Sequence, residues 1–270
     1  MRESTKAKFD AICASLSGKN VLVAFSGGVD SSVLAHLAKK CAASVNLIII
    51  TSPTVPEREL HDAREVAREL GLDLHEESFK WLEEQNLSEN LVDRCYTCKR
   101  ALADLWLVYA QRMDVDTVIE GTTATETEGY RPGLAALEEA AVESPYLQEG
   151  ISKAEVREYA RENGLSMAEK PSMACLATRF PYGTEISQER LNMVATVEDA
   201  VMQIFGVQCV RARYHGDLVR VEVGVEELSK MFDPEKLRRL DLIAKDAGFT
   251  YVTLDLQGYR TGAMDEGLSS

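Results

Sequence analysis

Short apolar runs alternate along the chain with segments in which apolar residues recur every three or four positions. Residues 21–25 and 45–50 are unbroken apolar runs, which are typical of strands buried on both faces of a parallel sheet. Residues 56–70 instead carry one apolar helical face, and Gly71 follows as a helix stop. This alternation predicts an α/β fold with a doubly wound parallel sheet, in which ligands bind at the carboxyl edge of the strands.

Shorter elements continue the same pattern. Strands are predicted at 72–75 and 117–119, with a helix at about 99–113 between them. Ser152 and Glu155 have the spacing of a capping box, which predicts a helix that runs to Asn163.

The pattern changes beyond Lys170, so we predict a first domain at 1–170 and a smaller α+β domain at 171–270. The turn His215-Gly216-Asp217 is typical of a hairpin. The predicted elements of this second domain are a long loop, a helix at 187–205, hairpin strands at 209–214 and 218–223, a helix at 233–247 and a strand at 251–256. Its amphipathic surfaces are suited to self-association, and we expect a homo-oligomer.

The segment between the first strand and its helix carries the most chemical information. It reads Ser26-Gly27-Gly28-Val29-Asp30-Ser31-Ser32. Glycines let the backbone approach phosphate oxygens, and the serine hydroxyls add donors to the free N–H groups of a helix N-terminus. Asp30 would repel phosphate, so we expect it to hold Mg²⁺ or to orient the serines. The segment predicts a pyrophosphate-binding loop, with an ordinary strand-to-helix turn as the alternative.

Other residues at strand ends are expected to line the same nucleotide crevice. Thr51 ends the second predicted strand, and Gly121 follows the fourth. Lys99 is expected beside ATP or an adenylate. The chain contains no Walker A sequence, which disfavours transfer of the γ-phosphoryl group.

Composition limits the class of partner. The chain has 270 residues, enough for one well-buried domain and a smaller one, and its formal net charge is −14. Such a charge disfavours binding to nucleic acid, whereas a small anionic substrate needs only a few arginines. The apolar runs are too short to span a membrane, and the N-terminal residues lack the apolar core of a signal peptide. We therefore expect a cytoplasmic protein.

Six cysteines are present, and they fall into two groups. Because a reducing compartment disfavours disulfides, Cys13, Cys41 and Cys209 are predicted to be buried free thiols. Cys95 and Cys98 are three residues apart, which suits a shared metal or a redox pair.

A structural zinc site is disfavoured for Cys95 and Cys98, because the sequence offers no second C-x-x-C and no nearby histidine pair. One further thiol, Cys175, lies in a polar, loop-like context. Three thiolates can hold a cubane iron-sulfur cluster and leave one iron open, so the three cysteines predict such a centre.

Paired arginines predict an anion site in the second domain. Arg211 and Arg213 are two apart on a predicted strand, so they project from one face and suit a phosphate dianion. The alternative is a set of cross-strand ion pairs with Glu222 or its neighbours. Arg179 either orients a carboxylate or phosphate or is an exposed loop arginine.

The glycine loop resembles the SGGxDS signature of the PP-loop ATP pyrophosphatases, which have an adenine nucleotide alpha hydrolase-like fold. The order SGGVDS, C-x-x-C-K, S-M-A-C-L-A-T-R-F-P-Y-G around Cys175 and then two arginines resembles the LarE family of ATP-dependent sulfur transferases. The resemblance implies adenylation of a carboxylate of pyridinium-3,5-biscarboxylate mononucleotide. That carboxylate would then become a thiocarboxylate on the route to the nickel-pincer nucleotide.

The likeness also implies the cofactors. Members with only the equivalent of Cys175 give up the sulfur of that cysteine and keep dehydroalanine. This chain resembles the subgroup with three cysteines. That resemblance implies a 4Fe-4S cluster held by Cys95, Cys98 and Cys175, a separate source of sulfide, and the use of ATP and Mg²⁺. It favours the phosphate interpretation of Arg211 and Arg213.

Other functions stay open at this point. One alternative is another PP-loop enzyme, either a tRNA thiolase or an amidating synthetase. A tRNA thiolase would need a basic surface, and an amidating enzyme would not need three thiols. A second alternative is a module that senses ATP without turning it over.

Overall fold

A computed structural model describes residues 1–127, 132–171 and 174–260 of the chain, and the side chains of 126, 127 and 132 lie outside that description. The chain divides into two compact units. The first unit comprises Met1–Phe79 and Asp93–Met173, and the second comprises Lys80–Val92 and Ala174–Ser270. The division near 173 lies close to the predicted boundary at 170, whereas Lys80–Val92 had been placed in the first domain.

The first unit contains a parallel sheet of four strands in the order β3-β2-β1-β4. The strands are β1 (Asn20–Ala24), β2 (Ser44–Thr51), β3 (Leu74–Ser78) and β4 (Thr117–Ile119). Val23 of β1 is in register with Leu47 on one side and Ile119 on the other. The predicted doubly wound α/β class is therefore confirmed, and β3 lies slightly later in the chain than predicted.

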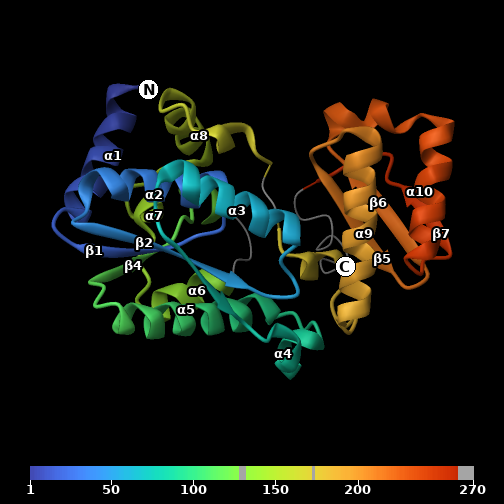
Figure 1. The fold of residues 1–270 in the computed structure, drawn as a ribbon, viewed down its shortest axis with the longest axis horizontal. Helices are drawn as coiled ribbons and strands as arrows, with labels where there is room; N and C mark the ends of the chain where they lie inside the picture. The colour runs from blue at the N-terminus through green and yellow to red at the C-terminus, as the bar shows by residue number, and fades with distance from the viewer. Residues whose placement is uncertain (128–131, 172–173, 261–270) are drawn as a thin grey trace. The chain divides into compact units, whose positions relative to one another are not determined.

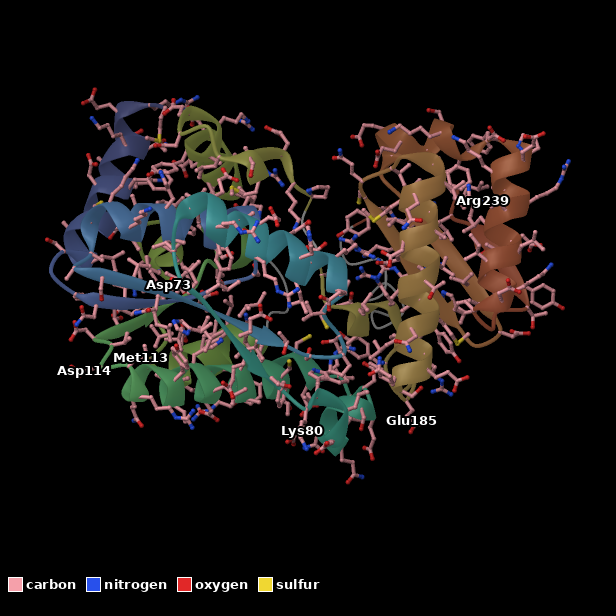
Figure 2. The ribbon with its side chains drawn as sticks, in the orientation of Figure 1. Asp73, Lys80, Met113, Asp114, Glu185 and Arg239 are labelled. Atoms are coloured by element: carbon pink, nitrogen blue, oxygen red, sulfur yellow. A yellow bond between two sulfur atoms is a disulfide. The ribbon has the colours of Figure 1, made fainter. Side chains whose placement is uncertain are left out.

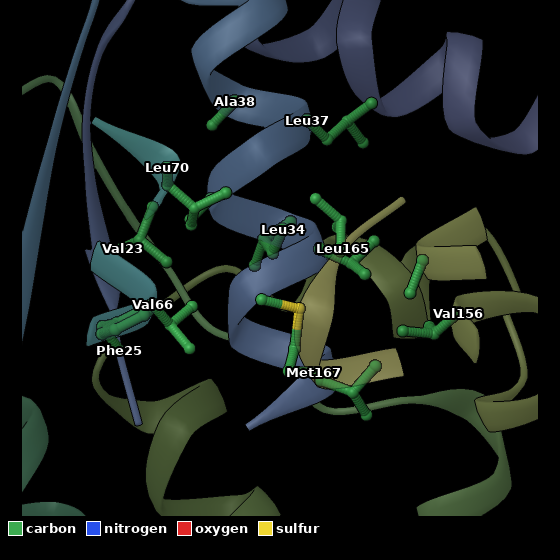
Figure 3. Close-up of a cluster of buried hydrophobic side chains, with 14 of the residues drawn as sticks. Val23, Phe25, Leu34, Leu37, Ala38, Val66, Leu70, Val156, Leu165 and Met167 are labelled. Carbon is green, nitrogen blue, oxygen red and sulfur yellow. The ribbon is translucent and has the colours of Figure 1, made fainter. Parts of the chain in front are cut away.

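Helices cover both faces of this sheet (Figure 1). One face carries α1 (Glu3–Leu16), α2 (Val29–Cys41), α3 (Glu57–Leu70) and α8 (Lys153–Glu162), and the other carries α5 (Arg94–Arg112) and α6 (Pro132–Glu139). The core on this face joins side chains from β1, α2, α3 and the segment after α8, among them Val23, Leu34, Val66 and Met167 (Figure 3). Apolar burial on both faces explains why the strands read as continuous apolar runs.

The second unit has a sheet of three strands in the order β5-β6-β7. Strands β5 (Val210–His215) and β6 (Leu218–Val223) are antiparallel, β7 (Tyr251–Leu254) is parallel to β6, and the long helices are α9 (Gln188–Phe205) and α10 (Pro234–Asp246). These elements confirm the predicted smaller α+β class.

The segment Lys80–Val92 is fastened to the second unit by backbone hydrogen bonds. It contains the 3₁₀ turn η1 (Trp81–Glu83) and the short helix α4 (Gln85–Ser88). The Ile186 N–H donates to the Ser88 carbonyl at 2.7 Å, and the Gly183 N–H donates to the Asn90 carbonyl at 2.9 Å.

Several short elements lie between the main ones: η2 (Ala124–Thr127), α7 (Pro145–Gln148), η3 (Ser166–Glu169), η4 (Leu176–Arg179) and η5 (Val225–Met231). Among the longer helices, α5 begins at Arg94 rather than near Lys99. The pair Cys95 and Cys98 therefore lies on a helix, in its first turns.

The prediction of free thiols was wrong for Cys13 and Cys41, which form a disulfide between α1 and α2 with a Cα–Cα separation of 5.2 Å. No local sequence pattern marks this pairing, because only tertiary packing brings the ends of the two helices together. Cys209 is a free thiol as predicted, but it is only half-buried, and this partial burial raises its pKa.

The outer side chains of the two units are largely charged. Figure 2 labels several exposed examples, including Asp73, Lys80, Asp114, Glu185 and Arg239. Over the residues that the structure describes, none of the helices combines the length and apolar character that crossing a membrane requires.

Candidate active site

The loop formed by residues 26–32, called the glycine loop below, depends on Gly27. Its φ angle is +69°, in the left-handed region that favours glycine. A β-carbon at this position would lie 2.6 Å from the Cα atom of Ala63 and 2.8 Å from its Cβ atom. The loop therefore passes directly against α3, and both the backbone conformation and the available space require glycine.

Hydroxyl groups brace the glycine loop from inside. The Ser26 N–H donates to the Ser31 Oγ atom at 3.2 Å, and the two hydroxyl oxygens are 3.1 Å apart. The Ser31 hydroxyl also donates to the Gly28 carbonyl at 3.3 Å. Ser32 is completely buried, and its hydroxyl has no hydrogen-bond partner among the described residues. Such an unmet polar group at a helix N-terminus favours a bound ligand.

Asp30 lies in the first turn of α2 and uses only one carboxylate oxygen. Its Oδ2 atom forms an ion pair with the ammonium of Lys153, the first residue of α8. Its Oδ1 atom is buried and finds no hydrogen-bond partner within the described part of the chain. A free carboxylate oxygen beside a phosphate cradle is the kind of ligand that Mg²⁺ prefers, so the donor set at Asp30 fits the predicted cation.

The residue Gly121, which follows Glu120 at the end of β4, packs closely against the first turn of α2. A β-carbon at Gly121 would lie 3.1 Å from both the Asp30 Cβ atom and the Ser31 nitrogen. The buried Glu120 carboxylate accepts hydrogen bonds from the Thr122 N–H at 3.1 Å, from the Thr122 hydroxyl at 2.7 Å and from the Ser144 hydroxyl. Glu120 thus fixes the loop after β4, which presses Gly121 against Asp30.

Thr51 and Lys99 lie elsewhere in the first unit. The Thr51 hydroxyl donates to the Glu77 carbonyl at 3.3 Å, at the carboxyl end of β2. Lys99 packs against Gly133 of α6, where an added β-carbon would lie 3.4 Å from the Lys99 Cγ atom. The Lys99 ammonium lies 5.7 Å from the centre of the Trp106 ring.

Cys95 and Cys98 project from the N-terminal end of α5. Their spacing places both thiols on one helical face, with Cys95 exposed and Cys98 partly buried. The buried Arg94 guanidinium lies 3.7 Å from the Cys95 sulfur. The helix N-terminus and this guanidinium together supply positive charge that can balance anionic sulfur ligands.

Cys175 is exposed and lies directly before η4. Its carbonyl accepts hydrogen bonds from the Thr178 N–H at 3.0 Å, the Thr178 hydroxyl at 2.8 Å and the Arg179 Nη1 atom at 3.4 Å. The backbone at Cys175 is therefore held firmly, while its thiol stays accessible.

Arg179 is fully buried and forms an ion pair with Glu198 of α9. The Arg179 Nε atom donates to Glu198 Oε1 at 2.6 Å, and the same oxygen accepts from the Ala212 N–H at 3.0 Å. The pair ties the Cys175 turn to α9 and β5. Of the two interpretations made from the sequence, an exposed loop arginine is wrong.

Arg211 and Arg213 are also buried. Arg213 forms the cross-strand ion pair with Glu222, at 2.8 Å, and its Nη1 atom donates to the Thr178 carbonyl at 3.0 Å. Arg211 donates to the Val210 carbonyl at 2.7 Å, and its guanidinium lies 4.7 Å from the centre of the Tyr259 ring. Burial, followed by the charge of Arg179, lowers the pKa of Arg211.

These three arginines, with Glu198 and Glu222, form what is called the arginine cluster below. Arginines outnumber carboxylates in this set, so the cluster carries surplus positive charge. Such a surplus is compatible with an anionic ligand, although the ion pair of Arg213 matches the alternative made from the sequence.

The predicted residues are thus divided between the two units. The glycine loop, Thr51, Lys99, Gly121, Cys95 and Cys98 belong to the first unit, and Cys175 and the arginine cluster belong to the second. Within either unit, the described residues form no group of three or more His, Cys, Asp or Glu side chains that could hold a metal ion. The three thiols fit an iron-sulfur cluster in their chemistry and in their exposure or partial exposure.

Sequence reasoning did not identify Lys153 or Glu120 as site residues. The capping box beside Lys153 was recognised, but it fixes only where α8 starts and not where the lysine side chain points. Glu120 directly follows the predicted fourth strand, but no local pattern marks its third donor, Ser144, which lies 24 residues later in the chain.

Comparison with known proteins gives related sequences over nearly the whole chain. Residues 12–208 match the asparagine synthase family. A protein of Synechocystis sp. described as uncharacterized is 35% identical over 250 residues, which cover 92% of each chain. The pyridinium-3,5-bisthiocarboxylic acid mononucleotide synthase of Lactiplantibacillus plantarum is 29% identical over 255 residues, which cover 93% of this chain and 91% of that protein. A Methanocaldococcus jannaschii protein described as uncharacterized is 28% identical over 263 residues, or 97% of this chain and 96% of its own.

Proposed function

The chain belongs to the asparagine synthase family of PP-loop proteins, and from that premise we propose that it is an ATP-dependent sulfur transferase. The proposed substrate is pyridinium-3,5-biscarboxylate mononucleotide, one carboxylate of which becomes a thiocarboxylate. The observation that supports this function most strongly is the nearly full-length match to a protein named pyridinium-3,5-bisthiocarboxylic acid mononucleotide synthase. We place the reaction in the cytoplasm.

The first half of the reaction uses ATP at the glycine loop. A carboxylate oxygen of the substrate attacks the α-phosphorus, the bond to the bridging oxygen breaks, and pyrophosphate leaves. Ser26, Gly27, Gly28, Ser31 and Ser32 would hold the departing pyrophosphate through backbone N–H groups and hydroxyls. Thr51, Lys99 and Gly121 would line the rest of the nucleotide site.

Asp30 would hold Mg²⁺ through its free Oδ1 atom. The cation would balance the charge of the pyrophosphate group when bound. Asp30 is fixed for this role by its neighbours, because the fully buried Tyr146 donates to its backbone carbonyl at 3.1 Å and Gly121 packs against its side chain.

The second half of the reaction replaces oxygen with sulfur. A sulfur nucleophile attacks the carbonyl carbon of the adenylate, and AMP leaves with the original carboxylate oxygen. We propose that Cys95, Cys98 and Cys175 hold a 4Fe-4S cluster, which when bound would supply inorganic sulfide through its open iron. Sacrifice of the Cys175 sulfur is the competing route.

The substrate phosphate is assigned to the arginine cluster. Arg211 and Arg213 keep the phosphate-binding role proposed from the sequence, supported by the surplus of arginines over carboxylates in the cluster. Arg179 would act mainly by holding the Cys175 turn, because its guanidinium is occupied by Glu198 and by the Cys175 carbonyl.

The test combines ATP, sulfide and the biscarboxylate mononucleotide with anaerobically purified protein. Wild-type protein is expected to release pyrophosphate and to form a thiocarboxylate product detectable by mass spectrometry. Cys175→Ser should still release pyrophosphate, because adenylation does not need the thiol, but should form no thiocarboxylate. Absence of pyrophosphate release from the wild type would contradict the proposed function.

Iron and sulfide analysis separates the two sulfur routes. Repeated turnover with bound iron, and loss of that iron in Cys95→Ser and Cys98→Ser, supports the cluster. The control is Cys209→Ser, which removes a half-buried thiol outside the proposed ligand set. A single turnover that leaves dehydroalanine at position 175 would instead favour the sacrificial route.

A further inference from the structure

Lys153 places an ammonium group in the glycine loop from a distant part of the sequence. It forms an ion pair with Asp30 Oδ2, and the two side chains are about equally shielded, with exposed fractions of 23% for Lys153 and 22% for Asp30. None of the roles assigned above uses this lysine. Its ion pair is nevertheless the contact that joins α8 to the first turn of α2 at the proposed phosphate site.

The base of the Lys153 side chain is rigidly placed. Ser152 accepts a hydrogen bond from the Glu155 N–H, and the Glu155 carboxylate accepts one from the Ser152 N–H at 2.8 Å, which completes a capping box. The Lys153 N–H also donates to the Thr125 hydroxyl at 3.0 Å. These contacts fix the backbone, so the freedom of Lys153 resides in its long side chain.

Ligand binding would change the charge interactions within the glycine loop. In the free protein Asp30 and Lys153 neutralise each other, while Asp30 Oδ1 and the Ser32 hydroxyl have no hydrogen-bond partner among the described residues. A cation that takes the Asp30 carboxylate would weaken its attraction for Lys153. Phosphate oxygens would then become the nearest strong acceptors for the released ammonium.

We propose that Lys153 is a pyrophosphate-binding residue that Asp30 holds in reserve until nucleotide and cation arrive. The exchange involves no covalent change: the ammonium leaves a carboxylate oxygen and donates to a phosphate oxygen. The inference rests on the proposed function, since it takes ATP to bind at the glycine loop. It adds a lysine that enters the site from α8 rather than from the loop itself.

Calorimetric titration with magnesium pyrophosphate tests the lysine directly. Lys153→Met is expected to weaken binding about tenfold or more, the usual weight of a charge-assisted hydrogen bond. Lys153→Gln, which keeps a polar side chain without the charge, should weaken binding to a similar extent. Lys153→Arg should retain much of the affinity for magnesium pyrophosphate.

Lys8→Met is the matched control. Lys8 forms an ion pair with Glu155 of the same helix at 3.0 Å, with exposed fractions of 32% and 20%. Its removal also leaves an α8 contact unpaired but touches no residue of the glycine loop, so pyrophosphate affinity should be unchanged. Thermal melting of each variant shows that it is folded.

Metal-free pyrophosphate gives a second, independent test of the exchange. Asp30→Asn should free Lys153 without a cation, so this variant should bind metal-free pyrophosphate more tightly than the wild type. The gain should disappear in the double variant Asp30→Asn/Lys153→Met. If the double variant keeps the gain, the effect is simple relief of repulsion, and Lys153 is not a ligand.

The outcomes separate the inference from the function on which it rests. If the wild type binds neither ATP nor pyrophosphate, the proposed function fails. If the wild type binds both, and the affinity of Lys153→Met for magnesium pyrophosphate equals that of Lys8→Met, the function stands and the inference is overturned.

Discussion

Some buried polar groups in the glycine loop of the first unit are left without partners among the described residues, whereas those of the pair Arg179–Glu198 in the second unit are hydrogen-bonded. In the glycine loop, Asp30 Oδ1 and the Ser32 hydroxyl have no partner among the residues that the structure describes. In the arginine cluster, Glu198 accepts hydrogen bonds from Arg179 on both carboxylate oxygens and from the Ala212 N–H. Glu222 Oε1 has no hydrogen-bond partner among the described residues, but it lies 2.9 Å from the Arg220 guanidinium in an ion pair.

This difference distinguishes groups that are available to bind a ligand from groups that stabilise the fold. Buried polar groups are nearly always hydrogen-bonded in folded proteins, so unmet groups in a cradle indicate a site that a ligand completes. Charges that already satisfy each other hold the scaffold, and removing one of them leaves the other buried and unpaired. We therefore expect the glycine loop to bind the ligand and the pair Arg179–Glu198 to support the Cys175 turn.

The largest expected effect is on stability, from Arg179→Met. Loss of the guanidinium removes the ion-pair partner of the fully buried Glu198, which should lower the free energy of unfolding by about 3–5 kcal/mol. Chemical denaturation of the full chain measures the change.

The control is Arg68→Met, because Arg68 forms an exposed ion pair with Glu65 and should contribute less than about 1 kcal/mol. If Arg179→Met keeps its stability and loses only substrate binding, the comparison is broken and Arg179 is a phosphate ligand after all.

The next largest effect is expected at the glycine loop itself. Gly27→Ala combines a left-handed φ angle with a clash against Ala63, which should cost about 2–4 kcal/mol and weaken ATP binding. Gly150→Ala is the matched control, since Gly150 has a φ angle of +60° but nothing within 4 Å of an added β-carbon. It should cost only about 1–2 kcal/mol in unfolding free energy. Equal losses in the two variants would show that the contact with Ala63 is unimportant.

The smallest effect is expected at Glu155, a carboxylate of the first unit whose oxygens accept several hydrogen bonds, as those of Glu198 do in the second unit. Burial raises its pKa, but hydrogen bonds from Ser152, Lys8 and Thr5 outweigh that effect and lower it from 4.5 to about 2. A lowered folded-state pKa stabilises the protein above pH 4.5, and this contribution is lost as the pH falls from 4.5 towards 2.

Lys8→Met should move the pKa of Glu155 upward and shift that loss to a higher pH. Titration of the Glu155 carboxyl carbon by NMR measures the pKa, with acid unfolding recorded in parallel. An unchanged pKa would mean that the capping box alone accounts for the shift.

Features that depend on local backbone chemistry could be predicted from the sequence. The buried strands, the glycine loop and the hairpin follow from apolar runs and from glycines placed where the chain must turn. The start of α5 was harder to predict, because its N-cap Asp93 makes no side-chain capping hydrogen bond. The helical setting of Cys95 was therefore missed.

Features that depend on a distant partner could not be predicted. The direction of the Lys153 side chain depends on Asp30, and the burial of Arg179 depends on Glu198. The disulfide joins Cys13 and Cys41 across 28 residues, with no local pattern to mark it. The three thiols are divided between the two units, so their convergence on one cluster stays a prediction.

The segment Lys80–Val92, which belongs to the second unit although Asp93–Met173 of the first unit follows it in the sequence, has a consequence for synthesis of the protein. These residues leave the ribosome well before Gly183 and Ile186, which supply their backbone hydrogen bonds. At ordinary translation speeds Ser88 waits roughly 5–20 s for Ile186 to be synthesised. During that interval the nascent chain carries a piece of its second unit whose partners have not yet been synthesised, and keeping that piece from aggregating becomes a task for the cell.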